Sequence, residues 1–374
     1  MSAKTAIVIG AGIVGLATAR ALAMKGYSVQ VYERNLKASG ASVRNFGMIW
    51  PIGQPAGKQY ERAIRSRNIW KETGDAAGLW YDTVGSLHLA YHPDEWQVLQ
   101  ELSETFTAEG RNVKILNKEQ ILNISAIAKA ENCKGGLFSS EEVIVDPREA
   151  IGRLPEYFHE NLSIRFIWGK TITAVKTGHI EIGSQRIQAD QVFICSGADF
   201  ETLYPDQFAQ FPLTKCKLQM MRLVQEGSPR IGPAVCGGLS LIHYASFKTA
   251  PSLDLLKKRF EDEMPDFLNW GIHVMVCQNK SGELTVGDSH EYGLAPDPFD
   301  RKFINDMILK YLDGFTHLTS PELIETWNGV YGKLTNGGTD LFFSPEPEVY
   351  VINAVGGAGM TLSFGLTEEI INGL

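Results

Sequence analysis

The chain has 374 residues, enough for two domains, and its 44% hydrophobic and 21% charged residues are ordinary for a globular protein. A formal net charge of −8 argues against binding to nucleic acid or to an anionic membrane. The five cysteines form no C-x-x-C pair, so no metal site or disulfide framework is predicted, and a cytoplasmic setting is favoured. No stretch reaches the ~18 uncharged apolar residues that a membrane span needs.

The first predicted unit is a strand, a glycine-rich turn and a helix. Residues 4–9 are apolar and rich in β-branched side chains, and residues 16–25 have helical composition. Between them, Gly10 allows a tight turn, Gly12 lets a pyrophosphate approach the backbone, and Gly15 permits close packing of the helix. Free N–H groups at the start of the helix then face the phosphates.

A second strand at residues 28–32 follows this unit and ends in Glu33. An acid at that point is placed to accept hydrogen bonds from a ribose. Strand, glycines, helix, strand and acid occur in the order of a dinucleotide site, against the alternative of a glycine-rich turn that binds nothing. The pattern leaves open whether the ligand is FAD or a nicotinamide nucleotide.

The next segment departs from a plain nicotinamide dehydrogenase, where a third strand–helix unit usually begins. A loop of small and polar residues at 34–42 is followed by a mixed aromatic, amide and cationic stretch at 43–54. Candidate site residues in this second stretch are Arg44, Asn45, Met48, Trp50 and Gln54. The alternative for this stretch is an ordinary buried loop.

The middle of the chain contains further helices and strands. Helices are predicted at 60–73, 94–108, 147–159, 253–264 and 300–312, and strands at 85–91, 163–168 and 190–195, with a β meander at 170–189. A strand-rich region begins at residue 212 and includes 238–247, 272–277 and 283–287. This region predicts a mostly antiparallel sheet, distinct from the opening α/β unit.

The chain ends as it begins, with a strand, a glycine loop and a helix. Residues 348–354 form the predicted strand, 355–361 the loop and 362–371 the helix. A helix N-terminus there can offer N–H groups to an anion or a ring carbonyl. The alternative is a glycine-rich loop that binds nothing. The presence of two such loops in one chain argues against this alternative for either loop.

These features together resemble the D-amino-acid oxidase superfamily, which includes glycine oxidase and monomeric sarcosine oxidase. The resemblance rests on the opening glycine motif, Glu33, residues 39–42, residues 195–198 and residues 356–361. The resemblance implies FAD as cofactor and an α/β Rossmann-like FAD-binding domain joined to an α+β substrate domain. It implies FAD-binding segments at 1–85, 143–211 and 325–374, and substrate-domain segments at 86–142 and 212–324.

The resemblance also implies which residues hold the cofactor. Its cofactor residues correspond to Gly10, Gly12, Ile13, Val14, Gly15, Glu33, Arg34, Ser39, Ala41, Ser42, Val175, Ser196, Gly197, Gly357, Gly359, Met360 and Thr361. Val175 would contact the adenine through its backbone. The family moves a hydride from the carbon bearing a substrate amine to flavin N5, and the resulting imine hydrolyses. The substrate is therefore expected to be a small amine, with O₂ or another compound as electron acceptor.

One part of the chain resembles a narrower clade. Residues 41–54 are similar to FAD oxidoreductases proposed to act in phosphonate breakdown, on 2-aminoethylphosphonate or a relative. Family oxidases often place an arginine after a W-x-G-like turn to hold a carboxylate, but here Tyr331 stands at about that place, with Lys333 nearby. A tetrahedral phosphonate could instead meet Arg44, Lys333, Tyr331 and a histidine. His243 and His273 are the preferred histidines.

Two rival functions stay open at this point. One is a glycine- or sarcosine-type oxidase of unmodified amino acids, and the other is a flavin-binding protein without turnover. Sarcosine oxidases link flavin through a cysteine near the position of Gly329, where this chain has none. The sequence therefore predicts non-covalent FAD.

Overall fold

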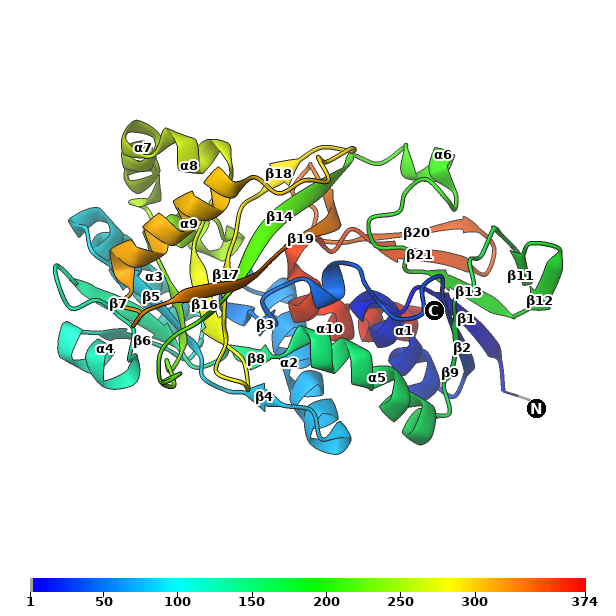
Figure 1. The fold of residues 1–374 in the computed structure, drawn as a ribbon. Coiled ribbons are helices and arrows are strands. Elements are labelled where there is room, and N and C mark those ends of the chain that lie inside the picture. The colour runs from blue at the N-terminus through cyan, green and yellow to red at the C-terminus, as the bar shows by residue number, and fades with distance from the viewer. Residues whose placement is uncertain (1–2) are drawn as a thin grey trace.

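A computed structural model describes residues 3–374. Two large sheets dominate it, one toward each end of the view in Figure 1, and two small sheets flank them. The six-stranded sheet has its strands in the order β20 (Leu341–Glu346), β21 (Val349–Asn353), β13 (Gln191–Ile194), β1 (Thr5–Ile9), β2 (Ser28–Glu33) and β9 (Arg165–Trp168). All neighbours are parallel except β20, which is antiparallel to β21.

The helices of this half cover one face of the six-stranded sheet. They are α1 (Ile13–Met24), α2 (Lys58–Ala77), α5 (Pro147–Leu162) and α10 (Gly359–Gly373). Their buried side chains form one hydrophobic cluster with β1 and β2, which is the arrangement expected for strands that read as continuous apolar runs. The other face packs on the meander β10 (Ala174–Lys176), β11 (His179–Ile182) and β12 (Gln185–Gln188), and on α6 (Pro205–Phe208).

The second large sheet has nine strands. They are β18 (Glu291–Tyr292), β14 (Leu213–Val224), β17 (Leu284–Gly287), β16 (Met275–Gln278), β15 (Ala234–Cys236), β5 (Ser86–Ala90), β7 (Gly135–Ser139) and β6 (Val113–Leu116), with β19 (Glu322–Leu334) paired to β14. Only the β15–β5 pair is parallel among these described strands. The mostly antiparallel sheet expected from the sequence is therefore confirmed.

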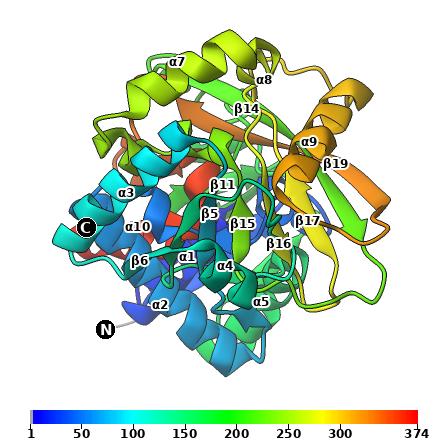
Figure 2. The same ribbon diagram turned by 90° about the vertical axis from the view of Figure 1, so that its left-hand side faces the viewer.

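Helices and short turns surround this larger sheet. They are α3 (Pro93–Ala108), α4 (Lys118–Ile124), α7 (Leu253–Glu263), α8 (Pro265–Asn269) and α9 (Lys302–Phe315). Figure 2 shows α3, α7, α8 and α9 around the strands β5, β15, β16 and β17. A small antiparallel sheet has the strand order β3 (Met48–Ile49), β8 (Val143–Val145) and β4 (Tyr81–Asp82).

Two sequence-based expectations differ from the structure. Residues 238–247 were expected to continue a strand, but they form the 3₁₀ helices η3 (Gly238–Ile242) and η4 (Ala245–Thr249). Residues 238–241 are all buried and do not alternate, so their apolar character does not distinguish a strand from a tight helical turn. Strand β19 was assigned from residue 325 to the FAD-binding part, yet it pairs along β14 in the nine-stranded sheet.

Close helix packing joins the two ends of the chain. Helix α10 packs against α1 and α2, and a Cβ at Gly365 would lie 2.4 Å from the backbone oxygen of Arg62. Buried Arg62 also pairs with Glu369 of α10 and with Asp340.

No helix within residues 3–374 combines the length and apolar character that crossing a bilayer requires. The cytoplasmic setting stays a prediction.

Candidate functional site

A cavity of about 910 Å³ lies between the two large sheets and contacts both glycine loops. Its wall comes from the β1–α1 turn, the loop after β2, residues 41–55, the end of β13, the inner face of the nine-stranded sheet, β19 and the loop before α10. A volume of this size is at the upper end of the usual range for a ligand site.

The β1–α1 turn gives the cavity its first glycine loop. Gly10 has φ +105°, and a Cβ there would lie 2.4 Å from the carbonyl oxygen of Cys195. A Cβ at Gly15 would lie 1.9 Å from the carbonyl oxygen of Gly10, so the helix and the turn touch through backbone alone. Both positions therefore require glycine, for the reasons that the sequence pattern predicts.

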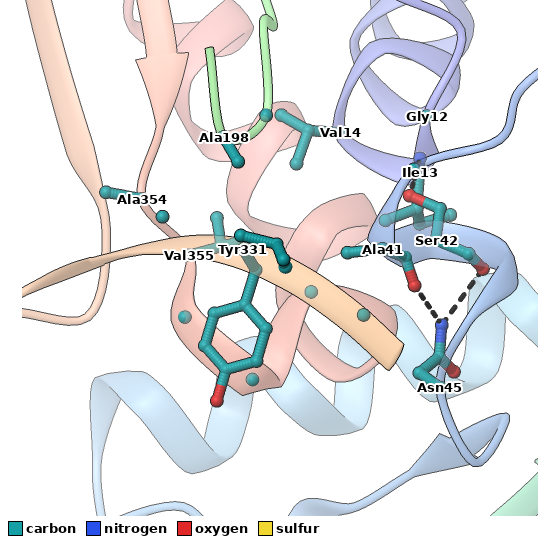
Figure 3. Close-up of a pocket in the computed structure, with 18 of the residues that line it drawn as sticks. Gly12, Ile13, Val14, Ala41, Ser42, Asn45, Ala198, Tyr331, Ala354 and Val355 are labelled. Carbon is teal, nitrogen blue, oxygen red and sulfur yellow. Dashed lines mark hydrogen bonds between the residues drawn. The ribbon is translucent and has the colours of Figure 1, made fainter. Parts of the chain in front are cut away.

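Two side chains brace this loop from the next segments of the chain. The Glu33 carboxylate accepts the Ala11 N–H at 3.0 Å and the Asn35 N–H at 3.0 Å. The Ser42 hydroxyl oxygen accepts the Ile13 N–H at 2.9 Å, and Figure 3 shows Ser42 facing the start of α1. Ser42 lies in the 3₁₀ turn η1 (Ala41–Val43). The start of α1 and the Glu33 carboxylate thus face the same part of the cavity.

Asn45 fixes the shape of the η1 loop. Its amide nitrogen donates to the carbonyl oxygens of Ala41 and Ser42, both at 2.9 Å, as the dashed lines in Figure 3 mark. Its amide oxygen accepts the Gly47 N–H at 2.7 Å. With these three bonds made, Asn45 orients the loop more than it offers free hydrogen-bonding groups to a ligand.

The second glycine loop lies at the N-terminus of α10. The 3₁₀ turn η5 (Gly356–Ala358) leads into the helix, and Gly357, Gly359, Met360 and Thr361 all line the cavity. The Thr361 hydroxyl accepts the Trp50 backbone N–H at 2.9 Å, which ties residues 48–54 to this loop. The two glycine loops therefore open onto one cavity from opposite ends of the chain.

Nearly all the residues predicted for the site line this cavity. Those that do are Gly10, Gly12, Ile13, Val14, Glu33, Arg34, Ser39, Ala41, Ser42, Arg44, Asn45, Met48, Trp50, Gln54, Ser196, Gly197, His243, His273, Tyr331, Lys333, Gly357, Gly359, Met360 and Thr361. Gly15 and Val175 are not among the lining residues. Gly15 acts behind the loop, through the close packing described above.

The placement of Val175 corrects one sequence-based assignment. Its side chain is buried in the meander, and its carbonyl oxygen accepts the Tyr204 hydroxyl at 2.9 Å. Residues 170–172, just before β10, reach the cavity instead. Strand β10 follows these residues and no longer lines the cavity. The order of the motifs along the sequence does not show which residue of this segment reaches the cavity.

Tyr331 and Lys333 project from β19 toward the second glycine loop. A Cβ at Gly357 would lie 3.2 Å from the Tyr331 hydroxyl oxygen, and Figure 3 shows Tyr331 beside Val355 and α10. The Lys333 ammonium lies 3.5 Å from the Tyr292 hydroxyl. Exposed Arg44 lines the same cavity, with its guanidinium donating to the Asn328 carbonyl at 3.1 Å.

Three histidines and an aspartate form the far wall. One ring nitrogen from each of His243, His273 and His290 lies within 4.8 Å of the other two. Asp288 approaches His273 Nε2 at 3.2 Å and His290 Nε2 at 3.9 Å. The histidines follow η3, precede β16 and precede β18, so the cluster forms only when separate parts of the larger sheet come together.

Burial sets the charge of this cluster. It lowers the pKa of His290 to about 4 and holds the pKa values of His243 and His273 well below their usual range. Burial also raises the pKa of Asp288 well above that of a free carboxyl. His243 is exposed at the cavity wall yet lies deep among protein atoms, so desolvation still governs its titration. The three imidazoles are therefore neutral near pH 7.

Sequence reasoning missed Asp288, Tyr292 and Asn353 as neighbours of the site. Asp288 and Asn353 line the cavity, and Tyr292 meets Lys333. The sequence predicts His243 and His273 but not His290, which also lines the cavity. The segment 288–292, Asp-Ser-His-Glu-Tyr, is a polar run directly after the buried strand β17, and that change from apolar to polar residues is the signal that could have marked Asp288 and Tyr292.

Comparison with known proteins agrees with this geometry. The family model described as "FAD dependent oxidoreductase" matches residues 5–372. A crystal structure of glycine oxidase from Bacillus cereus superposes with a TM-score of 0.78 at 14% identity, covering 100% of this chain and 95% of that one. L-proline dehydrogenase from P. horikoshii gives 0.76 at 18% identity, covering 99% and 93%. At these identities the structures establish the fold alone.

Curated relatives of similar sequence are larger proteins. One is the tRNA 5-methylaminomethyl-2-thiouridine biosynthesis bifunctional protein MnmC of Saccharophagus degradans, 28% identical over 258 residues. That match covers 63% of this chain and 34% of the relative. The MnmC protein of Chromobacterium violaceum is 27% identical over 253 residues, with 63% and 36% covered. The chain thus corresponds to about a third of the length of these relatives.

Proposed function

Because the chain belongs to the family of FAD-dependent oxidoreductases, we propose that it oxidises a small primary or secondary amine that carries a phosphonate, such as 2-aminoethylphosphonate. The membership confirms three expectations from the sequence: the Rossmann-like fold with a mixed second sheet, FAD as the cofactor, and an enzyme of the oxidoreductase class. The substrate is the part that is proposed.

The described residues fit FAD. Two backbone positions accept only glycine, and the start of α1 offers N–H groups where a pyrophosphate would lie. Glu33 lies beside this loop to meet a ribose, and the N-terminus of α10 opens onto the other end of the cavity. Bound FAD would supply the acceptor for a hydride from the carbon that bears the amine. The protein's part is to bind and orient the amine and to exclude water.

The substitution at β19 carries the choice of substrate. Tyr331 stands at about the place where family oxidases often have an arginine. The guanidinium that could bind a planar carboxylate in a bidentate manner is therefore missing at this position. Lys333, two residues on, offers a point charge at the cavity wall, and Arg44 lines the same cavity. Point charges and hydroxyls suit a tetrahedral phosphonate better than a planar carboxylate. The imine product then hydrolyses in water.

Steady-state kinetics test this proposal. We expect kcat/KM for 2-aminoethylphosphonate to exceed that for glycine and for sarcosine by at least about tenfold, or ~1.4 kcal/mol of transition-state binding. Propylamine, which has an amine but no anion, is the matched control and should be a poor substrate. Faster turnover of glycine or sarcosine than of every aminophosphonate would contradict the proposal and favour an amino-acid oxidase.

We also propose that FAD is held without a covalent bond. Among the cysteines of residues 3–374, only Cys195 lines the cavity, and it lies beside Gly10 and Thr18 at the nucleotide end. Burial raises the pKa of the Cys195 thiol to about 12, so it is a poor nucleophile. Acid precipitation should therefore leave the yellow colour in the supernatant. Flavin that stays with the precipitate would contradict this.

A tRNA nucleoside is a second candidate substrate, because the MnmC relatives are named for tRNA modification. The net charge of −8 disfavours it, since tRNA binding relies on basic surfaces. A gel-shift assay with unmodified tRNA at low salt tests it, and tight binding would favour this candidate. Repeating the steady-state kinetic assays with O₂ and with other electron acceptors shows which compound reoxidises the flavin.

A further inference from the structure

The histidine cluster in the cavity wall has more in common with a metal site than with a packed core. Three of the eight histidines of the chain meet there, although they are 17 or more residues apart in sequence. The spacing has no H-x-x-H pattern, which is why the sequence predicts no metal. Their convergence depends on η3 and on the segments flanking β16 and β17.

A hydrogen bond fixes which ring nitrogen of His290 carries the lone pair. His290 Nδ1 lies 2.9 Å from the Gly271 carbonyl oxygen, which can only accept, so this nitrogen carries the hydrogen. His290 Nε2 is then the nitrogen with the lone pair. His273 Nε2 lies 3.2 Å from the Asp288 carboxylate, while His273 Nδ1 is buried and has no partner among the described residues. His290 therefore has one nitrogen held and one available, and His273 has its Nδ1 available.

This arrangement matches the outer shell of a metal-binding histidine. Such a ligand donates its second ring N–H to a carboxylate or a backbone carbonyl, which sets its tautomer and orientation. His290 has the carbonyl, and the carboxyl group of Asp288 lies 3.2 Å from His273 Nε2. We propose that His243, His273 and His290 bind one Zn²⁺ ion at the wall of the substrate cavity, with Asp288 as a positioning residue.

The required adjustment is small. Zn–N bonds of about 2.0–2.1 Å place the nitrogens of a tetrahedral site roughly 3.3 Å apart. One nitrogen from each ring already lies within 4.8 Å of the other two, so bringing three such nitrogens to that spacing takes an approach of roughly 1.5 Å. The ring centroids of His243 and His273 lie 3.7 Å apart, so His243, which is exposed at the cavity wall, is the ligand that has to reorient, whereas His290 is held by the Gly271 carbonyl.

Three histidines leave the fourth ligand position open. The cluster lines the same cavity as Lys333, so an ion there would face a bound substrate. An anionic oxygen of the substrate could then complete the coordination, as in zinc sites that keep one exchangeable position. This role rests on the proposed function, but the presence of the ion does not.

The test is metal content, measured without any assay of turnover. Tag-free, FAD-loaded protein is stripped with EDTA, dialysed against Zn²⁺, passed through a desalting column and analysed for zinc per flavin. We expect about one Zn²⁺ per FAD. His273→Ala and His243→Gln should each reduce retained zinc to background, and the exposed-site control His317→Gln should retain it. Asp288→Asn should weaken Zn²⁺ binding by about 10–100-fold.

Cobalt gives a second readout of the ligands. Co²⁺ bound by three histidines in a four-coordinate site should give visible bands at wavelengths beyond the flavin absorption, and these should vanish in His243→Gln. His243→Gln changes a residue exposed at the cavity wall, so unchanged flavin content would show that the variant is folded. Wild-type protein that retains no zinc, or variants that retain as much as wild type, would overturn the proposal. Phosphonate binding by metal-free protein at undiminished affinity would overturn the role of the ion.

Discussion

The two large sheets meet the cavity in different ways. The six-stranded sheet presents backbone: glycine turns, helix N-termini and one buttressing acid, all close together in sequence at each end of the chain. The nine-stranded sheet presents side chains, among them His243, Asp288 and Lys333, from segments up to 90 residues apart. We propose that the first kind of surface holds the nucleotide, which is common to many proteins, and that the second holds a particular substrate.

The difference sets what each change should do. A change on the nucleotide side alters backbone geometry and should remove the cofactor whatever the substrate. A change on the substrate side should leave the flavin in place and alter which amines are used. The following predictions test that division, from the largest expected effect to the smallest.

Gly10→Ala should nearly abolish FAD binding. Its Cβ would meet the Cys195 carbonyl oxygen at 2.4 Å, and φ +105° is unfavourable for alanine. Together these cost about 3 kcal/mol, or roughly 100-fold in FAD affinity. Flavin fluorescence titration of the apoprotein measures it. Gly152→Ala, in α5 with nothing within 4 Å, is the control and should stabilise the fold by up to about 1 kcal/mol. Equal FAD affinity in both variants would contradict the account.

Lys333→Met should raise KM for 2-aminoethylphosphonate by about 10–100-fold while FAD stays bound. The loss corresponds to one charge-assisted contact of about 1.5–3 kcal/mol. Lys215→Met is the matched control, because Lys215 also lines the cavity but is paired with Glu201 at 2.7 Å. Steady-state kinetics on both variants decide it. A KM that rises equally in both would mean that overall charge, and not Lys333, attracts the substrate.

His88→Leu should reduce the acid sensitivity of folding. His88 is fully buried with neither ring nitrogen hydrogen-bonded among the described residues, and burial lowers its pKa to about 3. Between that value and the unfolded value of about 6.5, the unfolded state binds the extra proton. Stability is therefore complete above about pH 6.5 and falls as the pH drops, by up to about 1.4 kcal/mol per pH unit from this residue.

Urea unfolding of the two proteins at pH 5 and pH 8 measures this effect. The wild type should lose more stability than His88→Leu between pH 8 and pH 5. Since the ring packs against Phe247 and Trp50, leucine keeps most of the apolar contact. Parallel losses in both proteins would show that His88 does not titrate as its burial implies.

Ser42→Ala should have the smallest effect. It removes the acceptor of the Ile13 N–H and a wall of the phosphate site, while the other glycine-loop contacts remain. One hydrogen bond of about 1 kcal/mol corresponds to a roughly fivefold weaker FAD affinity. The same fluorescence titration measures it. A loss as large as that for Gly10→Ala would show that side chains hold the pyrophosphate more than backbone does.

The comparison also explains which features could be predicted from sequence. The β1–α1 turn, Glu33 and the α10 loop were predictable because each is a local pattern whose residues are neighbours in the chain. The histidine cluster and Asp288 were not, because their proximity depends on strand order and on the 3₁₀ turns at 238–249. Val175 was misplaced because position along the sequence does not fix which way a meander faces.

The central claim is that an amine reduces the flavin held between the two glycine loops. Anaerobic titration of the purified holoenzyme with small amines tests it most directly, because it needs no electron acceptor. The account predicts that 2-aminoethylphosphonate bleaches the flavin absorbance at about one equivalent per FAD, faster than glycine or sarcosine. Flavin that stays oxidised with every amine would contradict it and indicate a flavin-binding protein without turnover.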